Sequence, residues 1–226
     1  MLKHLISLRN PKSRSAEAFR TLRTNIQFSS LDNELESIVV TSSGSGEGKS
    51  TVMSNLAITM AESGKKIILV DCDLRKPSIH KKMGVTNSVG LTNILVQNVL
   101  KEDCIAVSPI KNLYILTSGP VPPNPAELLG TKKMRDFIEE LKREFDMVLI
   151  DAPPVLAVTD AQILSTIADG VILVASYGEA QKNALVDAKQ LIDKVGGKVI
   201  GIVFNKVPEA ASGYNGKYYE GYYDKN

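Results

Sequence analysis

Short apolar segments rich in valine and isoleucine alternate along this chain with longer stretches of helical pattern. Six segments are predicted to be strands: 37–42, 66–71, 113–117, 147–151, 170–176 and 198–205. Most are apolar on both faces, which is typical of parallel strands covered by helices on both sides. The predicted helices lie between them, at 50–63, 88–98, 131–144, 160–168 and 180–195. The alternation predicts an α/β fold with a doubly wound, mostly parallel sheet.

The connections of such a sheet determine where a ligand binds. Right-handed crossovers bring the carboxyl ends of all parallel strands to one edge of the sheet. Ligands of open α/β sheets bind outside that edge. Side chains that follow strands are therefore the first candidates for a functional site.

Residues 15–29, which precede the first strand, have the pattern of an amphipathic helix. Phe19, Leu22 and Ile26 share one face of it. A polar stripe at a spacing of three residues runs along the same helix and consists of Glu17, Arg20 and Arg23. Pairs at this spacing are common on solvated helices, so the stripe alone does not indicate a partner.

The chain after Val207 contains no Ile, Leu, Val or Met and cannot build a core. We therefore expect one domain at 1–207 and a flexible tail at 208–226. Five of the seven tyrosines lie in the tail, at Tyr214, Tyr218, Tyr219, Tyr222 and Tyr223. An even spread would place roughly 0.4 of a tyrosine in the last residues from 214 on. The cluster suits a substrate that extends into an active site; the alternative is an adhesive aromatic tail.

Composition excludes several classes of protein. The chain has 226 residues and a net charge of +2, which is too balanced to predict nucleic acid as the main partner. Its two cysteines, Cys72 and Cys104, form no disulfide framework and no zinc pair, and we expect reduced thiols in a cytoplasmic protein. No run of 18 apolar residues is present, so we expect no membrane span.

The strongest chemical signal lies between the first predicted strand and the helix after it. It is a phosphate-binding loop, Ser43-Gly44-Ser45-Gly46-Glu47-Gly48-Lys49-Ser50, followed by Thr51. Glycines let backbone N–H groups turn toward phosphate oxygens, and the helix N-terminus adds partial positive charge. In this motif the lysine reaches the β- and γ-phosphates and the serine binds Mg²⁺. Ser43 departs from the pattern, which begins with glycine.

Carboxylates follow two other predicted strands. Asp151 ends the apolar segment 147–151, where a nucleotidase places a ligand for Mg²⁺ or its water. Asp71 and Asp73 end the segment 66–71 and could serve one metal ion and one base. The Asp151 signal alone is weak, because strands often end in aspartate, and the alternative for Asp71 and Asp73 is a solvated turn. With the loop present, the three motifs are expected to converge on one sheet edge.

Together these motifs resemble the bacterial tyrosine kinases, a P-loop family distinct from the eukaryotic protein kinases. The similarity extends over nearly the whole chain. ILVDCDLRKP, residues 68–77, resembles the extra Walker-type motif of the family, and VLIDAPP, residues 148–154, resembles its Walker B motif. Glu17-x-x-Arg20-x-x-Arg23 resembles its oligomerisation motif, and the tail resembles its tyrosine cluster.

The resemblance implies an ATP- and Mg²⁺-dependent protein-tyrosine kinase. Lys49 and Ser50 would hold the triphosphate and Mg²⁺, with Asp73 and Asp151 organising the ion. Asp71 and Asp73 would be the catalytic pair, and we expect Asp71 to accept the phenol proton or orient the tyrosine. Asn205 would line the adenine site, although an ordinary strand end is nearly as good an interpretation. Nucleotide contacts are expected at Gly44, Ser45, Gly46, Glu47, Gly48, Lys49, Ser50, Thr51 and Asn205.

The resemblance also implies assembly and partners. Phosphorylation would occur in trans within a ring held by Glu17, Arg20 and Arg23. A membrane protein of the polysaccharide co-polymerase type would activate this cytoplasmic chain at the inner face of the membrane. The process implied is the control of capsule or exopolysaccharide synthesis and export.

Two other functions compete. An ATPase switch of the septum-site or partition type would carry a signature lysine near the start of the loop, where this chain has Gly44. Such proteins also lack the tyrosine tail. A non-enzymatic scaffold would bind nucleotide and only present the tail, but a complete set of Lys49, Ser50 and three aspartates argues for retained catalysis.

Overall fold

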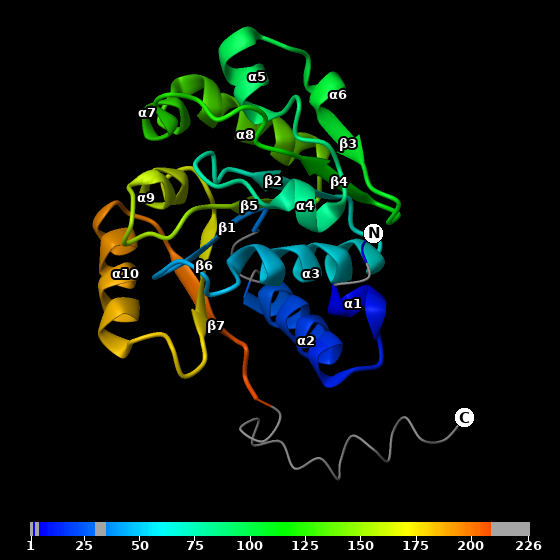
Figure 1. Cartoon of the computed structure of the whole chain (residues 1–226), viewed down its shortest axis with the longest axis vertical. Coiled ribbons are helices and arrows are strands. Elements are labelled where there is room, and N and C mark those ends of the chain that lie inside the picture. Colours follow the sequence, from blue (N-terminus) through cyan, green and yellow to red (C-terminus); the bar gives the residue numbers. More distant parts are fainter. Residues whose placement is uncertain (1, 3–4, 30–34, 209–226) are drawn as a thin grey trace.

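The protein folds as a single sheet between two layers of helices (Figure 1). The computed structural model describes residue 2 and residues 5–29 and 35–208. The strands are β1 (Ser37–Ser42), β2 (Ile67–Asp71), β3 (Ile105–Val107), β4 (Leu113–Leu116), β5 (Met147–Asp151), β6 (Gly170–Ser176) and β7 (Val199–Asn205). The longer helices are α2 (Arg14–Ser29), α3 (Lys49–Glu62), α8 (Lys132–Glu144) and α10 (Lys182–Lys194). The shorter helices are α1 (Ile6–Arg9), α4 (Ile79–Met83), α5 (Leu91–Gln97), α6 (Lys101–Cys104), α7 (Pro125–Leu129) and α9 (Asp160–Ser165).

The strands form one sheet in the order β3-β4-β2-β5-β1-β6-β7. All neighbouring pairs are parallel except β3 with β4. The predicted doubly wound, mostly parallel α/β fold is therefore confirmed. The strand β3 was not predicted, because it has only three residues and its side chains are half-buried or exposed.

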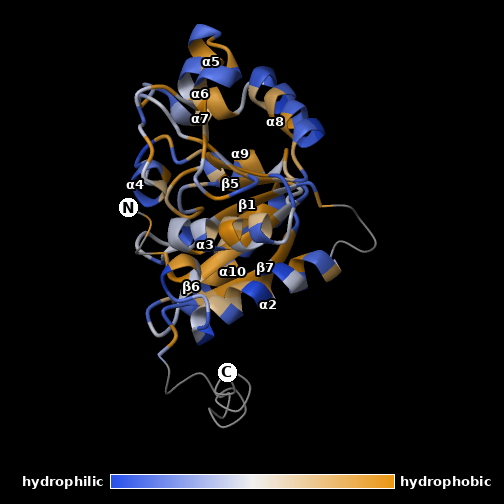
Figure 2. Ribbon diagram, turned by 90° about the vertical axis from the view of Figure 1, so that its right-hand side faces the viewer, coloured by the Kyte–Doolittle hydropathy of each residue, from blue (hydrophilic) through white to orange (hydrophobic). Residues whose placement is uncertain are grey.

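Two apolar layers cover the two faces of the sheet, and strand residues contribute to them in alternation. Ile38 and Val40 pack with α1, α2 and α3, whereas Val39 packs with α8, α9 and α10 on the opposite face. Coloured by hydropathy, the sheet is largely hydrophobic and the outer helix surfaces are mixed or hydrophilic (Figure 2). Burial on both faces explains why the strand sequences lack polar alternation.

The amphipathic helix expected at 15–29 is α2, which packs against α3. Ile26 is buried there, and Phe19 and Leu22 are partly buried in the same layer. The short helices α1, α4, α6 and α7 were not predicted. Among the helices that the structure describes, none combines the length and the hydropathy needed to cross a bilayer. The tail lies outside the described residues, so the domain division at 207/208 stays a prediction.

Asp169 joins three elements beside the amino ends of β1 and β6. Its Oδ2 accepts hydrogen bonds from the backbone N–H groups of Glu36 (3.0 Å) and Ser37 (2.8 Å), and from the Ser37 hydroxyl (2.8 Å). Its Oδ1 accepts one from Lys142 of α8 (3.1 Å). Burial alone would raise the pKa of Asp169, but the hydrogen bonds from Ser37 and Lys142 outweigh it and lower that pKa. The ionised carboxylate therefore stabilises the fold.

We predict that Asp169→Asn lowers the free energy of unfolding by about 1.5–3 kcal/mol at pH 7, because charged hydrogen bonds are lost. A lowered folded-state pKa contributes stability above the unfolded value of about 3.9 and loses it as pH falls through the folded value. The difference in the free energy of unfolding between Asp169→Asn and the unmodified protein should therefore become smaller as the pH falls from 5 to 3. Urea unfolding over this range measures it. Asp193→Asn, which removes an exposed i,i+4 pair with Lys189, is the matched control and should cost little. An equal penalty for both variants would contradict the prediction.

Candidate active site

The loop between β1 and α3 has the backbone of a phosphate cradle. Gly46 (φ +80°) and Gly48 (φ +90°) are left-handed, a conformation that glycine adopts without strain. Helix α3 begins at Lys49, directly after Gly48, and no side chain caps its first turn. Its partial positive charge thus remains available to an anion from outside the chain.

Two side chains hold this loop in shape. Ser43 Oγ donates to Glu47 Oε1 (2.6 Å), so the serine that replaces the usual first glycine closes the loop with a hydrogen bond. Asn205 at the end of β7 donates from Nδ2 to the carbonyl oxygen of Glu47 (2.9 Å). A Cβ at position 48 would lie 2.1 Å from that amide nitrogen, so a larger residue there would displace the Asn205 side chain in addition to straining φ. Asn205 was predicted at the adenine site, and the structure places it against the loop backbone.

Lys49 joins the loop to the carboxylates that follow β2 and β5. Its Nζ lies 3.0 Å from Asp73 Oδ2 and 3.7 Å from Asp151 Oδ1. Ser50 Oγ donates to Asp151 Oδ2 (2.6 Å). Burial alone would lower the pKa of Lys49, but the charges of Asp151 and Asp73 outweigh it and raise that pKa. The structure therefore brings the lysine, the serine and two of the three predicted aspartates into one ion-paired cluster.

Asp71 is fully buried beside this cluster and is held by backbone amides. Its Oδ2 accepts from Ser78 and Ile79 (3.0 Å each), at the start of α4, and its Oδ1 accepts from Asp73 (3.2 Å). Burial and repulsion by Asp151 outweigh these bonds and raise the pKa of Asp71 to about 7. Burial likewise raises the pKa of Asp151, although Lys49 and Ser50 act against it. Asp151 Oδ1 is buried without a hydrogen-bond partner in the described structure.

These features fit a Mg²⁺-bound nucleotide. An uncapped helix N-terminus and a left-handed glycine loop suit phosphates. Mg²⁺ is usually bound through one or two carboxylates together with phosphate oxygens and water. The Ser50 hydroxyl and Asp151 Oδ1, which has an ion pair with Lys49 but accepts no hydrogen bond in the described structure, are oxygen atoms that could bind such an ion, with Asp73 close to Lys49 as well.

Two contacts at this edge were not anticipated from the sequence. The Arg75 guanidinium binds the buried Asp160 carboxylate in a bidentate pair, at 2.9 Å and 3.0 Å. Lys82 donates to Thr51 Oγ1 (2.9 Å), and burial lowers the pKa of Lys82. No local pattern signals the first pair, since its members are 85 residues apart in sequence.

The remaining candidate residues lie away from this cluster. Arg20 pairs with Glu17 (2.7 Å) within α2 and donates to the Pro11 carbonyl oxygen. Arg23 donates to the Thr59 carbonyl oxygen of α3 (3.0 Å). The tail tyrosines lie outside the described residues.

Sequence comparison supports a kinase relationship. The family model "AAA domain" matches residues 35–199. Tyrosine-protein kinase YwqD of Bacillus subtilis (strain 168) is 45% identical over 205 residues, which cover 91% of this chain and 86% of that protein.

Solved structures give the same relationship. The chimerical protein CapA2B2 superposes with a TM-score of 0.87 at 39% identity, covering 91% of this chain and 90% of that one. The kinase domain of the Escherichia coli tyrosine kinase ETK superposes with a TM-score of 0.88 at 31% identity, covering 92% of this chain and 82% of that one. The septum site-determining protein MinD of Pyrococcus horikoshii OT3, complexed with Mg-ADP, is more distant, with a TM-score of 0.66 at 28% identity and coverage of 78% and 75%.

The raised pKa of Asp71 predicts how the ligand-free protein responds to pH. A carboxyl whose folded-state pKa is raised contributes stability below its unfolded value of about 3.9 and loses it as pH rises through about 7. We expect the free energy of unfolding to fall by at most about 4 kcal/mol over this range. Urea unfolding between pH 5 and pH 8, without nucleotide, measures the slope.

Asp71→Asn should reduce the slope of the free energy of unfolding against pH, because asparagine does not titrate in this range. The amide also faces backbone N–H donors, which lowers the free energy of unfolding by the same amount at every pH and so leaves the slope unaffected. Asp103→Asn, at an exposed position of α6, should keep the slope of the unmodified protein. Parallel curves for all three proteins would show that Asp71 titrates near its ordinary value.

Proposed function

The chain belongs to the bacterial tyrosine kinases and is an ATP-dependent protein-tyrosine kinase, and on that premise we propose that it phosphorylates the tyrosine cluster of its own tail in another copy. The observation that carries this proposal is the cluster of Lys49, Ser50, Asp73 and Asp151 at the mouth of the phosphate loop. We further propose that the reaction controls capsular or extracellular polysaccharide synthesis and export.

The loop and α3 would bind the triphosphate of ATP. Backbone N–H groups at Gly44–Thr51 would face the phosphate oxygens, and Lys49 would leave Asp73 to reach the β- and γ-phosphates. Mg²⁺, when bound, supplies charge neutralisation on these phosphates. Ser50, Asp73 and Asp151 would hold it.

Phosphoryl transfer from such a site depends mainly on positioning and electrostatics. The phenol oxygen of tyrosine forms a bond to the γ-phosphorus while the bond from that phosphorus to the bridging oxygen breaks, and ADP leaves. The phenol proton passes to a carboxylate, for which we propose Asp71. Its pKa of about 7 suits a base at neutral pH. Among the described residues, its Oδ1 accepts one hydrogen bond, from the Asp73 N–H, and so retains a lone pair.

Assembly and recruitment are proposed on the same basis. Glu17, Arg20 and Arg23 would exchange their bonds within the chain for bonds across a ring interface. Arg23 Nε, buried without a hydrogen-bond partner in the described structure, supports this. Phosphate on clustered tyrosines adds about −1.5 to −2 charge each, and the repulsion would withdraw the tail and open the ring. A membrane adaptor of the polysaccharide co-polymerase type would recruit the kinase to the inner face of the membrane.

We predict that the purified chain, incubated with Mg²⁺ and ATP, gains mass in steps of about 80 Da that map to Tyr214–Tyr223. Lys49→Met should abolish the gain because it removes the phosphate ligand, whereas Lys189→Met on the exposed face of α10 should not. Intact mass spectrometry and peptide mapping measure both.

A mixing experiment tests the trans step. A chain with all five tail tyrosines changed to Phe serves as donor, and the Lys49→Met chain serves as acceptor. Phosphate on the acceptor is expected. ATP hydrolysis without any mass gain would instead favour the ATPase switch, and the absence of both activities would favour a scaffold.

We predict that Arg20→Glu/Arg23→Glu reduces the assembled mass of the protein in solution, because the helix stripe reverses its charge. Light scattering coupled to size exclusion measures the mass, and circular dichroism checks the fold. Arg14→Glu, exposed on the same helix, is the control and should leave the mass unchanged. The proposed ring contact fails if both proteins retain the mass of the unmodified chain, or if phosphorylated and unphosphorylated protein form identical assemblies.

A further inference from the structure

Two large apolar side chains are exposed on loops at the sheet edge that holds the proposed catalytic carboxylates. Val121, in the loop after β4, is 60% exposed, and Leu156, in the loop after β5, is 40% exposed. The strand β2, which ends in Asp71, lies between β4 and β5 in the sheet. Since these strands are parallel, both loops leave the sheet at the edge that holds the carboxylates.

The Val121 loop is anchored on both sides. Asn87 binds Gly119 twice, accepting from its N–H (2.9 Å) and donating to its carbonyl oxygen (3.0 Å). Pro122 and Pro125 on the other side are buried. An exposed valine on an anchored loop offers a fixed apolar surface rather than one that must be ordered on binding.

The Leu156 loop is anchored in the same way. Val155 is buried, and its N–H donates to the carbonyl oxygen of Ser42 at the base of the phosphate loop (2.9 Å). The loop ends at the buried Asp160, where α9 begins. Helix α7, which follows the Val121 loop, packs against α9. The two apolar residues are therefore held in one part of the edge.

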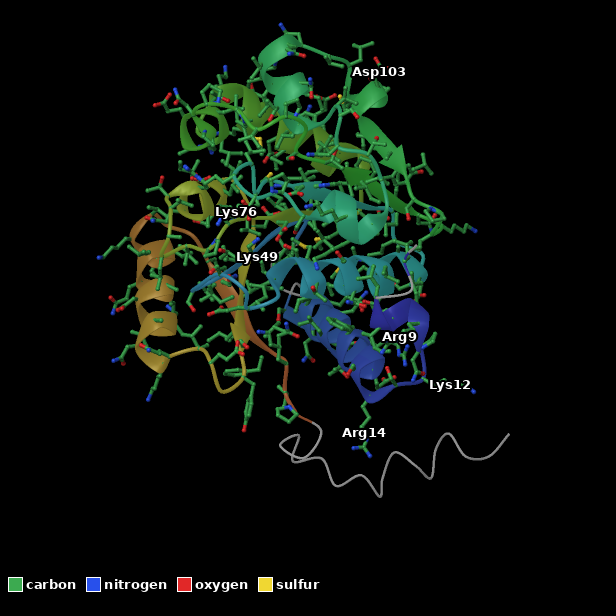
Figure 3. The ribbon with its side chains drawn as sticks, viewed as in Figure 1. Arg9, Lys12, Arg14, Lys49, Lys76 and Asp103 are labelled. Atoms are coloured by element: carbon green, nitrogen blue, oxygen red, sulfur yellow. The ribbon has the colours of Figure 1, made fainter. Side chains whose placement is uncertain are left out.

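The loop after β2, which lies between the Val121 loop and the Leu156 loop in the order of the sheet, carries two cations, Arg75 and Lys76. The charge of Arg75 is offset by Asp160, to which it is bound through both guanidinium branches. Lys76 is exposed, and its backbone N–H donates to Asp73 Oδ1 (3.0 Å). In the described part of the chain its ammonium has no ion pair. Lys76 and Lys49 lie at the same side of the molecule, between α9 and α3 (Figure 3).

We propose that Val121, Leu156 and Lys76 form the acceptor site, in which the apolar pair holds the tyrosine ring and Lys76 pairs with an acidic residue directly after the tyrosine. This inference rests on the proposed function. The tail offers two such segments, Tyr218-Tyr219-Glu220 and Tyr222-Tyr223-Asp224, whereas Tyr214 is followed by Asn215. The site therefore selects tyrosine followed by acid, and Tyr219 and Tyr223 are modified before Tyr214.

Peptide kinetics with the full chain test the selection. The enzyme carries Phe at its five tail tyrosines, so that only the added peptide accepts phosphate. One peptide has the sequence of residues 216–225, and a second has Gln and Asn in place of Glu220 and Asp224. The first should have a KM about 5-fold lower, as expected for one partly exposed ion pair. Lys76→Glu should remove this preference and favour a third peptide with Lys at both positions, whereas Lys12→Glu at the N-terminal end of the molecule should not (Figure 3).

The apolar pair is tested in the same assay. Val121→Ser and Leu156→Ser should each raise the peptide KM about 10-fold and leave the ATP KM unchanged. Val107→Ser and Leu100→Ser, at positions 75% and 67% exposed near β3, are the matched controls. The acceptor site is overturned if the tail is phosphorylated but Lys76→Glu keeps the acidic preference, or if the two serine variants behave like their controls. If the unmodified chain does not phosphorylate its tail at all, the proposed function fails as well, and the two failures remain distinguishable.

Discussion

The active site depends on a conflict between like charges that the sheet itself creates. Asp71 and Asp151 end adjacent parallel strands and are direct partners in the ladder, so the register alone brings two buried carboxylates together. Neither can move away without breaking the pairing of β2 with β5. The chain opposes the repulsion with Lys49, with the Ser50 hydroxyl and with the amides of the loop after β2. A site held in this way gains by receiving a cation, and the substrate of a P-loop enzyme arrives with one.

The rest of the architecture places partners around this pair. The β1–α3 loop, the loop after β2 and the loop after β5 meet at one edge because parallel strands all point to it. Each loop is fastened by contacts over long sequence distances, such as Arg75 with Asp160 and Asn205 with Glu47. These contacts hold the loops in place around the site without a ligand, which matters for an enzyme in which positioning supplies much of the rate.

The sequence predicted the strands and their order of alternation with helices well, and the long-range contacts between loops poorly. Runs of valine and isoleucine predicted six strands with ends within one residue of those observed, because burial on both faces leaves few alternatives. The convergence of Lys49 with Asp73 and Asp151 followed from topology. Helix α4 escaped detection because its first turn is fixed by the Asp71 carboxylate, a tertiary contact with no local pattern. The contact of Asn205 with the Glu47 carbonyl oxygen was not anticipated for the same reason, since it joins residues 158 positions apart in the sequence.

The end of β7 connects the phosphate loop to the chain that leads into the tail. Asn205 holds the phosphate loop, and only two residues later the described chain passes Val207 and continues into the tail. Lys206, between Asn205 and Val207, has a positive φ of 58°. Its ammonium pairs with Glu179, so an ion pair holds the chain at the point where its backbone leaves the extended conformation. A displacement of this strand end would therefore act on the phosphate loop through the Asn205 side-chain amide as well as on β6 through the backbone. Since thermodynamic linkage is reciprocal, a nucleotide that tightens the loop would also change how freely the chain leaves β7.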